Sequence, residues 1–360
     1  MTHTSGSRTI HPLLLARTCL LTTAAVLSTV SLVAQVPSFG SIDAPDAGTH
    51  RNQGTVATSI NGLNFITGWY IDNAGARHGF LRQNGGAITE FDPPSMTETF
   101  PTAINGSFQI LGYASRTGGG ETHEHGFLRS RFGQYDAVDV PGAADTLPYA
   151  MNDSGQIAGG YDDSVGHLHG FLRDTNGNYA ILDVPDQGTN TTLATTAKAI
   201  NANGVITGYY ADSLGVNHGF VRDASGNYVS FDAPGAGGSG TFPVSINGSG
   251  AITGSYSDDN FVAHSFVRDA SGNLVSFDMP GANQTFAESI NDSGAIVGQV
   301  SKGTGFAAFR RDSLGNFGLL SVPVENAGSS AANITGNRIT GYYVDLNGVS
   351  HGFTTRVLTR

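Results

Sequence analysis

The feature that most restricts the fold of this chain is an internal repeat. The tripeptide His-Gly-Phe occurs at positions 78, 125, 169, 218 and 351, as His-Ser-Phe at 264 and in an eroded form as Ala-Ala-Phe at 307. Successive copies lie 43 to 49 residues apart. A period of this length is typical of architectures in which one supersecondary unit recurs, so the fold has to be inferred from the unit.

Each repeat unit holds four short runs of β-branched and aromatic residues. In the fourth unit these runs are residues 198–201, 206–210, 218–222 and 228–232, and turns of the Asn-Gly and Asp-x-x-Gly kind lie between them. Such turns join antiparallel strands. Four antiparallel strands per unit are typical of a β-propeller blade, so we predict an all-β propeller of four-stranded blades. A β-sandwich and a parallel β-solenoid are the alternatives.

The strand runs are apolar or small on both faces, as expected when each blade is covered by neighbours on both sides. Every unit carries a glycine in its Ile-x-Gly run, for example Gly208. We expect this glycine to allow neighbouring blades to approach closely.

The two ends of the chain predict how the propeller closes. The last unit stops after His351 without its Phe-Asp-x-Pro strand, and an orphan copy of that strand, with Asp43 and Pro45, lies near the start. Seven copies of each motif result when the eroded positions Ala307 and Ser321 are counted. We therefore predict one seven-bladed domain over residues 35–360, whose N-terminal strand completes the last blade and leaves no open sheet edge.

The first 34 residues have the pattern of a secretory signal peptide. Arg8 and Arg17 precede an apolar run rich in Thr, Ser and Ala, and a polar segment begins near Gln35. The run is too short and too polar for a typical membrane span, although an uncleaved anchor is the alternative. The only cysteine, Cys19, lies in this segment, so the mature chain would carry no thiol. We expect a secreted protein, extracellular or periplasmic, that is monomeric and free of the membrane after cleavage.

The composition argues against nucleic acid as a partner. The formal net charge is −11, and Lys198 and Lys302 are the only lysines, so there is no basic footprint for phosphates. The 23 aspartates far outnumber the 6 glutamates, which favours turns over helices. No Gly-x-Ser-x-Gly, His-Glu-x-x-His or Walker motif occurs.

A histidine and an aspartate recur 14 residues apart in the intact units. With a five-residue turn that pairs Arg222 with Tyr228, His218 falls opposite Asp232 on one face of the sheet. The eroded sixth unit has lost both partners together. We interpret the pairs as structural hydrogen bonds, with metal binding or acid–base chemistry as the alternative. The pairs are His78 and Asp92, His125 and Asp139, His169 and Asp183, His218 and Asp232, His264 and Asp278, and His351 and Asp43.

Residues that differ between units are the candidates for ligand binding, because shared residues build the scaffold. We place the candidates in the connections between blades and in the loops between second and third strands. They are His50, Arg51, Glu98, Arg116, Glu121, His123, Glu124 and His167. Trp69 is a further candidate that could stack a sugar, although at the position of Tyr209 and Tyr342 we expect a half-buried aromatic between blades.

Metal binding is the weaker interpretation of these loops. His123, Glu124 and His167 could supply nitrogen and oxygen ligands, but we expect them to be solvated loop residues. The Asp-x-x-Gly segments lack the dense carboxylates of a calcium loop. We predict turns there, with weak calcium binding as the alternative, and no metal site or cofactor.

The unit Ile-Asn-x-x-Gly-x-Ile-x-Gly-x-Tyr followed by His-Gly-Phe-x-Arg resembles the extracellular HAF repeats of bacterial secreted proteins, named for a His-Ala-Phe core. The resemblance covers nearly the whole mature chain and implies secretion and a bacterial origin. It implies no activity and no catalytic residues. The chain departs from the core with glycine or serine at the alanine position of six units, namely Gly79, Gly126, Gly170, Gly219, Ser265 and Gly352.

Two classes of function follow from the sequence. The first is a non-catalytic binding or scaffold module for a glycan, a cell-wall polymer or a protein, favoured by the absence of a catalytic motif. A purely structural surface-layer role is a separate alternative. The second is a polysaccharide hydrolase or lyase that would use loop carboxylates such as Glu98, Glu121 and Glu124.

Overall fold

The hairpin chemistry of the repeats produces strands throughout the part of the chain that the computed structural model describes, residues 39–118, 121–184, 194–303, 305–322 and 326–357. Every regular element within these ranges is a strand, from β1 (Gly40–Ile42) to β28 (Ser350–Arg356). The all-β prediction is confirmed. The described residues belong to the unit Pro37–Arg360, and the predicted signal peptide with Cys19 lies outside them.

Four of the repeat units form separate sheets in which each strand pairs antiparallel with the next one along the chain. The sheets are β6 (Glu98–Ile104), β7 (Ile110–Gly118), β8 (Glu121–Arg129) and β9 (Tyr135–Ala137); β10 (Asp145–Met151), β11 (Ile157–Asp162), β12 (Leu168–Arg173) and β13 (Tyr179–Leu182); β14 (Thr195–Ile200), β15 (Ile206–Ala211), β16 (Asn217–Arg222) and β17 (Tyr228–Phe231); and β18 (Thr241–Ile246), β19 (Ile252–Ser257), β20 (Ala263–Arg268) and β21 (Leu274–Phe277).

The other described strands are joined in one twelve-stranded sheet. Its antiparallel groups are linked by two single parallel pairs, Gly54 with Ser350 and Phe306 with Gly328. The groups are β2 (Gly54–Ile60), β3 (Ile66–Ile71), β4 (Arg77–Arg82) and β5 (Ile88–Phe91); β22 (Gln284–Ile290), β23 (Ile296–Lys302), β24 (Gly305–Arg311) and β25 (Phe317–Leu319); and β26 (Asn326–Thr335), β27 (Arg338–Asp345) and β28 with β1.

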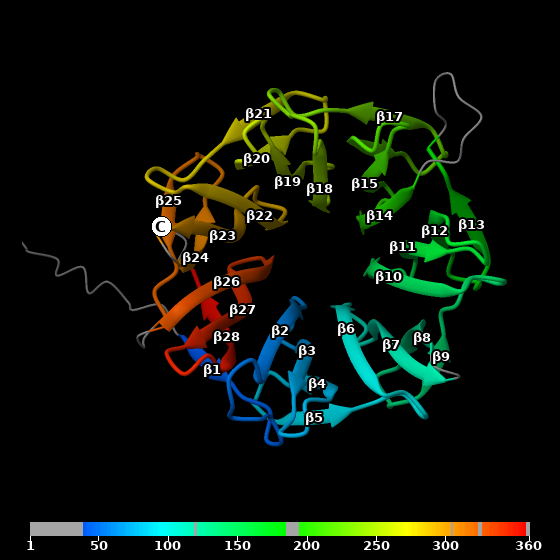
Figure 1. The fold of residues 1–360 in the computed structure, drawn as a ribbon, viewed down its shortest axis with the longest axis vertical. Coiled ribbons are helices and arrows are strands. Elements are labelled where there is room, and N and C mark those ends of the chain that lie inside the picture. Colours follow the sequence, from blue (N-terminus) through cyan, green and yellow to red (C-terminus); the bar gives the residue numbers. More distant parts are fainter. Residues whose placement is uncertain (1–38, 119–120, 185–193, 304, 323–325, 358–360) are drawn as a thin grey trace, which may run out of the picture. The chain divides into compact units, whose positions relative to one another are not determined.

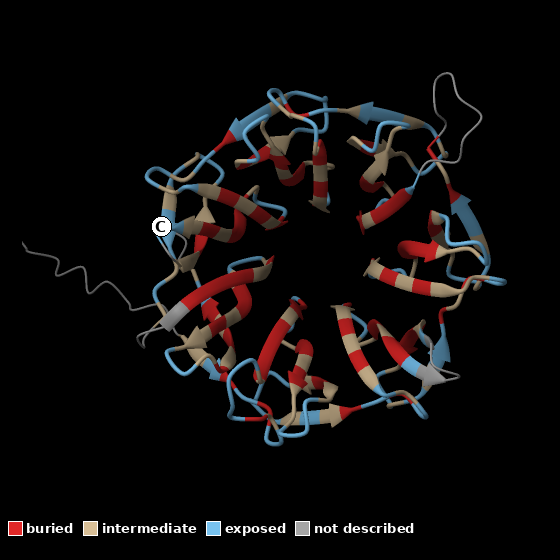
Figure 2. Ribbon diagram, viewed as in Figure 1, coloured by how far each residue is buried: buried red, intermediate tan, exposed pale blue. Residues whose placement is uncertain are grey.

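The strand groups are arranged around a central axis, and the first strand of each group lies nearest to that axis (Figure 1). The inner strands are buried or half-buried, whereas the outermost strands β13, β17 and β21 carry exposed residues (Figure 2). This is the arrangement of a propeller with four-stranded antiparallel blades.

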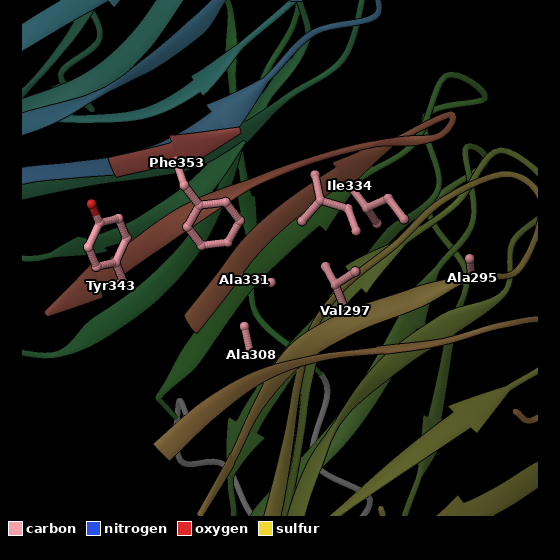
Figure 3. Close-up of a cluster of buried hydrophobic side chains, with 8 residues drawn as sticks. Ala295, Val297, Ala308, Ala331, Ile334, Tyr343 and Phe353 are labelled. Carbon is pink, nitrogen blue, oxygen red and sulfur yellow. The ribbon is translucent and has the colours of Figure 1, made fainter. Parts of the chain in front are cut away.

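The hydrophobic core is divided among the interfaces between neighbouring groups. One cluster joins Val297 of β23 and Ala308 of β24 to Phe353 of β28 (Figure 3). The phenylalanine of the repeated tripeptide is 4% exposed in the second unit and fully buried elsewhere. Burying it on both sides explains why this residue recurs in every unit. The residues are Phe80, Phe127, Phe171, Phe220, Phe266, Phe309 and Phe353.

The recurrent Ile-x-Gly glycine has a different role from the one predicted. Gly208 of β15 pairs with Ala197 of β14 in its own sheet, and a Cβ atom there would overlap the carbonyl oxygen of Thr196. The neighbour that requires the glycine is thus the adjacent inner strand, not another blade, and that prediction is wrong. In the other units, a Cβ atom on the equivalent glycine would overlap the equivalent carbonyl oxygen of its own inner strand. These glycines are Gly68, Gly112, Gly159, Gly254, Gly298 and Gly341.

Successive units are linked by the side chains of asparagines that directly follow the inner strands. Asn152 Nδ2 donates to the carbonyl of Asn201 at 3.0 Å, and Asn201 Nδ2 donates to that of Asn247 at 3.1 Å. Asn247 Nδ2 continues to Asn291 at 3.0 Å. The Oδ1 atom of Asn201 meanwhile accepts two backbone N–H groups of its own turn. These buried asparagines therefore both shape the turn and tie each unit to the next.

Candidate functional site

The repeated histidines and aspartates lie within hydrogen-bond distance of one another. Arg222 pairs with Tyr228, which confirms the predicted register. In the six pairs named above, the histidine Nδ1 atom lies 2.6 to 3.2 Å from a carboxylate oxygen of its aspartate. The pair His351 and Asp43 joins β28 to the residue that follows β1.

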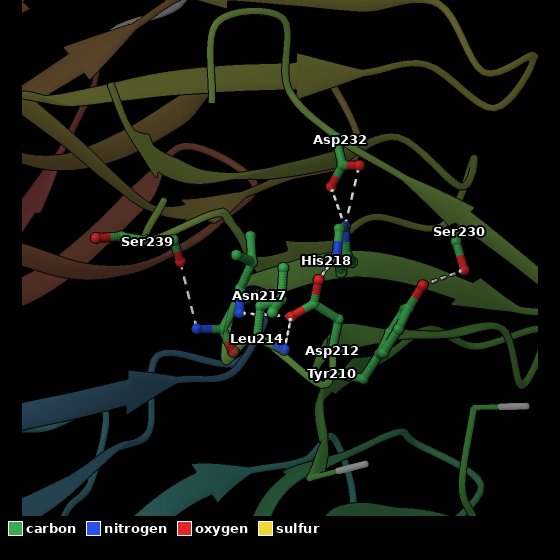
Figure 4. Close-up of polar contacts among 9 residues, drawn as sticks. Tyr210, Asp212, Leu214, Asn217, His218, Ser230, Asp232 and Ser239 are labelled. Atoms are coloured by element: carbon green, nitrogen blue, oxygen red, sulfur yellow. Dashed lines mark hydrogen bonds and ion pairs between the residues drawn. The ribbon is translucent and has the colours of Figure 1, made fainter. Parts of the chain in front are cut away.

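Five of these histidines have a second carboxylate that the sequence analysis did not assign. His218 Nε2 lies 3.4 Å from Asp212 in the Asp-x-x-Gly turn, and its ring packs on Tyr210 with centroids 5.3 Å apart (Figure 4). Burial lowers the pKa of His218, but the hydrogen bonds to Asp232 and Asp212 outweigh it and leave the pKa raised. The other second partners, 3.5 to 3.8 Å away, are Asp72, Asp163, Asp258 and Asp345.

The histidines therefore bridge the third strand of a unit to the turn before it and to the segment after the fourth strand. Each histidine and its aspartates belong to one repeat unit. The arrangement recurs with the strands that all units share. We keep the structural interpretation of these groups.

Several predicted loop residues lie in strands instead. Glu98 begins β6, and its carboxylate pairs with Arg77 at 3.2 Å. The Arg77 guanidinium lies 5.5 Å from the Trp69 ring and 5.4 Å from the Phe100 ring. Cation–π contacts thus hold this ion pair between Trp69 of β3 and Phe100 of β6.

Arg116, Glu121, His123 and Glu124 were also predicted in a loop, but they belong to an extended hairpin of β7 and β8 in which Arg116 pairs with His123. The backbone pairs continue beyond them, to Thr117 with Thr122 and Gly118 with Glu121. His123 Nδ1 lies 3.5 Å from Asp145. Burial raises the pKa of Glu124, and the charges of Asp145 and Glu98 add to the effect.

The remaining candidates lie apart from this hairpin. His50 and Arg51 are exposed in the connection from β1 to β2, where His50 bonds Gln53. His167 is exposed and bonds Asp163 of its own turn at 3.3 Å. Among the described residues, no group of three or more His, Cys, Asp or Glu side chains is arranged to hold a metal ion, so His123, Glu124 and His167 do not form the hypothesised site.

The sequence analysis missed a set of residues on the inner strands. The first strand of every unit has a register shift at the same place, which leaves one residue unpaired. Such a β-bulge redirects a side chain. All seven of these residues, which we call the bulge residues, are half-buried: Thr58, Thr102, Tyr149, Lys198, Val244, Glu288 and Ala332.

Bulge residues of neighbouring units contact one another's strands. Thr58 Oγ1 donates to the carbonyl of Pro101 at 2.9 Å, and Thr102 Oγ1 donates to that of Pro148 at 3.1 Å. The Lys198 ammonium lies 3.6 Å from the centre of the Tyr149 ring. The bulge residues therefore line one inner surface.

The inner surface carries an acid and a base. Burial raises the pKa of Glu288 to about 7, although the Lys198 ammonium acts in the opposite direction. Burial lowers the pKa of Lys198, which Glu288 partly offsets. The charge of each residue shifts the pKa of the other, although a whole unit, β18 to β21, lies between the unit of β14 and the unit of β22 along the chain.

Variation at one fixed position was the signal that could have revealed this surface. Three residues before the turn asparagine, the units carry Thr, Thr, Tyr, Lys, Val and Glu, while the flanking residues stay small or apolar. The sequence analysis counted Lys198 as a rare lysine and did not compare it with its counterparts.

The pKa of Glu288 predicts a pH-dependent stability. Because the folded pKa of about 7 exceeds the unfolded value of about 4.3, stability is fully present below pH 4 and falls as the pH rises through 7. We expect Glu288→Gln to remove this loss, which is up to about 3 kcal/mol. Urea unfolding of both proteins between pH 4 and 8.5 measures it, and parallel stability curves would contradict the assigned pKa.

No helix long and apolar enough to cross a membrane occurs among the described residues.

No family model and no curated protein matches the chain. Solved structures are similar in fold. Virginiamycin B lyase from Staphylococcus aureus has a TM-score of 0.53 at 14% identity, over 89% of this chain and 100% of that one. The β-propeller domain of the trilobed protease from Pyrococcus furiosus has a TM-score of 0.57 at 8% identity, over 89% and 94%. The BP39L lectin from Burkholderia pseudomallei has a TM-score of 0.54 at 12% identity, over 85% and 96%.

Proposed function

We propose that the chain is a secreted, non-catalytic binding module for an extracellular glycan, and that the glycan contacts the inner surface of the propeller. The observation that carries the proposal is the set of bulge residues. They occupy one position of a repeated framework, yet they range from Ala332 and Val244 to Tyr149, Lys198 and Glu288. Residues that vary on a constant scaffold are where specificity is placed.

The proposal includes a closed seven-bladed ring of the HAF repeat kind, monomeric and without a cofactor. Pairing of β1 with β28 and the bond from Ile60 N to Asn333 Oδ1, at 3.3 Å, support closure, because each joins the last unit to residues near the start. The similar domain from Pyrococcus furiosus is described as having an open velcro topology. Both open and closed propellers are therefore possible, and closure is a specific claim about this chain.

A glycan is favoured over a protein ligand by the aromatic side chains beside the bulge residues. Phe100 stacks on Tyr113 at 4.8 Å, and Tyr209 packs edge-on against Phe242 at 5.3 Å. Aromatic faces with a few polar groups suit sugar rings, which offer C–H faces and hydroxyl edges. One of the proteins similar in fold is a lectin.

A thermal-shift screen of the mature protein against soluble plant, fungal and bacterial polysaccharides tests the proposal. A ligand at a hundredfold excess over its Kd stabilises the native state by about 2.7 kcal/mol. We expect the shift to be lost in Tyr149→Leu and kept in Phe132→Leu, because Phe132 is 77% exposed in an outer turn. No shift with any polysaccharide, or an equal shift in both variants, would overturn the assignment.

A polysaccharide hydrolase or lyase is the second candidate, and the environment of Glu124 favours it. Burial and neighbouring carboxylates raise the pKa of Glu124, whereas Glu98 is held in an ion pair with Arg77. Two carboxyl groups in unlike environments are the pattern of an acid and its ionised partner. Shortening of a bound polysaccharide that stops in Glu124→Gln would establish this candidate.

A further inference from the structure

We propose that a pocket in the sixth repeat unit holds one neutral pyranose ring of the bound glycan. This inference rests on the proposed glycan-binding function and assigns a subsite to it. The pocket has a volume of about 400 Å³ and is lined by the side chains of Phe286, Gln299, Ser301, Phe306 and Tyr342.

The pocket lies where β22, β23 and β24 of the sixth unit meet β27 of the seventh. Phe306 forms the single parallel pair with Gly328, and a Cβ atom at Gly328 would overlap the Phe306 ring. The glycine therefore lets this ring lie against the next unit, and the two units together form the wall of the pocket.

The sixth unit is the one in which the repeated framework is interrupted. Val300 replaces the tyrosine that packs on the histidine in five of the other six units, and Ala307 replaces the histidine itself. The residue before the histidine position is Phe306 here, whereas the same position holds no aromatic in any other unit. The framework polar groups are thus lost in the same unit that gains a pocket with an added ring.

The lining determines the class of ligand. Three aromatic side chains, one amide and one hydroxyl face the pocket, and none of the lining side chains is charged. The negative faces of aromatic rings attract the C–H groups of a pyranose, and Gln299 and Ser301 can exchange hydrogen bonds with its hydroxyls. The volume is at the lower end of small-molecule sites, as expected for a short saccharide segment.

Charge selects against acidic sugars. Burial raises the pKa of the Tyr342 phenol, and the nearby charge of Glu288 raises it further. The lining offers no cation to a carboxylate on the ligand, and Glu288 would repel that carboxylate at a pH where Glu288 is ionised. We therefore expect neutral saccharides to bind and uronates to be rejected.

Calorimetric titration of the full mature protein tests the subsite with cellobiose, maltose and N,N′-diacetylchitobiose as probes and digalacturonate as the acidic comparison. We expect at least one neutral probe to bind, with affinity reduced about tenfold or more by Tyr342→Ala and by Gln299→Leu. Phe132→Ala is the control, because Phe132 is an aromatic side chain that is 77% exposed in a turn of the second unit. Thermal unfolding of each variant verifies its fold.

The outcomes separate this subsite from the wider proposal. Loss of binding in the two pocket variants and not in the control supports the subsite. A neutral probe that binds all variants equally, or binding of digalacturonate alone, overturns the subsite while leaving glycan binding in place. Failure of every probe, together with failure of the polysaccharide screen, overturns both; failure of the probes with a positive screen overturns the subsite alone.

Discussion

A mature chain that begins at Ala47 is expected to be about 5 kcal/mol less stable than one that begins at Phe39, because it lacks β1. Strand β1 pairs with β28 through three residues, from Gly40 with Thr354 to Ile42 with Gly352. Ile42 is 1% exposed and packs with Ile60 and Phe80 of the first unit. Truncation removes this packing, breaks the sheet pairing and leaves His351 without Asp43.

Urea unfolding at equal protein concentration measures the loss. Asp43→Asn in the longer chain is the control, because it keeps the strand and weakens the ion pair alone, so its effect should be a small fraction of the truncation effect. Equal unfolding midpoints for the two chain lengths would show that the ring is not closed by this strand.

Gly208→Ala is expected to destabilise the protein by about 4 kcal/mol or to prevent folding. The added methyl group would overlap the carbonyl oxygen of Thr196 in the adjacent strand, and backbone cannot move aside as a flexible side chain can. The matched control is Gly318→Ala in β25, where a Cβ atom meets nothing within 4 Å. Substitutions at such open sites usually change stability by less than about 0.5 kcal/mol.

Chemical denaturation of the two variants provides the comparison. Similar midpoints for Gly208→Ala and Gly318→Ala would mean that the inner strand can move away from the added methyl group, and that the contact with the Thr196 carbonyl does not require a glycine.

The outer half of each blade could be predicted from sequence because its geometry is local. A short turn of fixed length sets the register between third and fourth strands, so Arg222 and Tyr228 could be paired by counting. The four-strand units followed from the spacing of turn residues.

The inner half could not be predicted, because a bulge has no local signature. If side chains alternated strictly along β14, Lys198 would pair with a residue of β15. The register shift between Ala197 and Ala199 leaves it without such a partner. The close contact of Gly208 with the Thr196 carbonyl likewise depends on how β14 lies against β15, which no local motif specifies. The sequence analysis instead assigned ligand binding to loops, where His50 and His167 lie exposed and apart from each other.

The spacing between the linking asparagines and the bulge residues has an evolutionary consequence. Lys198 lies within β14 and Asn201 directly follows that strand, so the asparagine that fastens each unit to its neighbour is separate from the bulge residue three positions before it. Tyr149 and Asn152 have the same relation to β10. A bulge residue has no partner in the ladder, so exchanging it disturbs few framework contacts. If the proposed binding surface is right, duplication of such a unit supplies both a fixed framework and a variable position, and single substitutions there change the binding preference without a new fold.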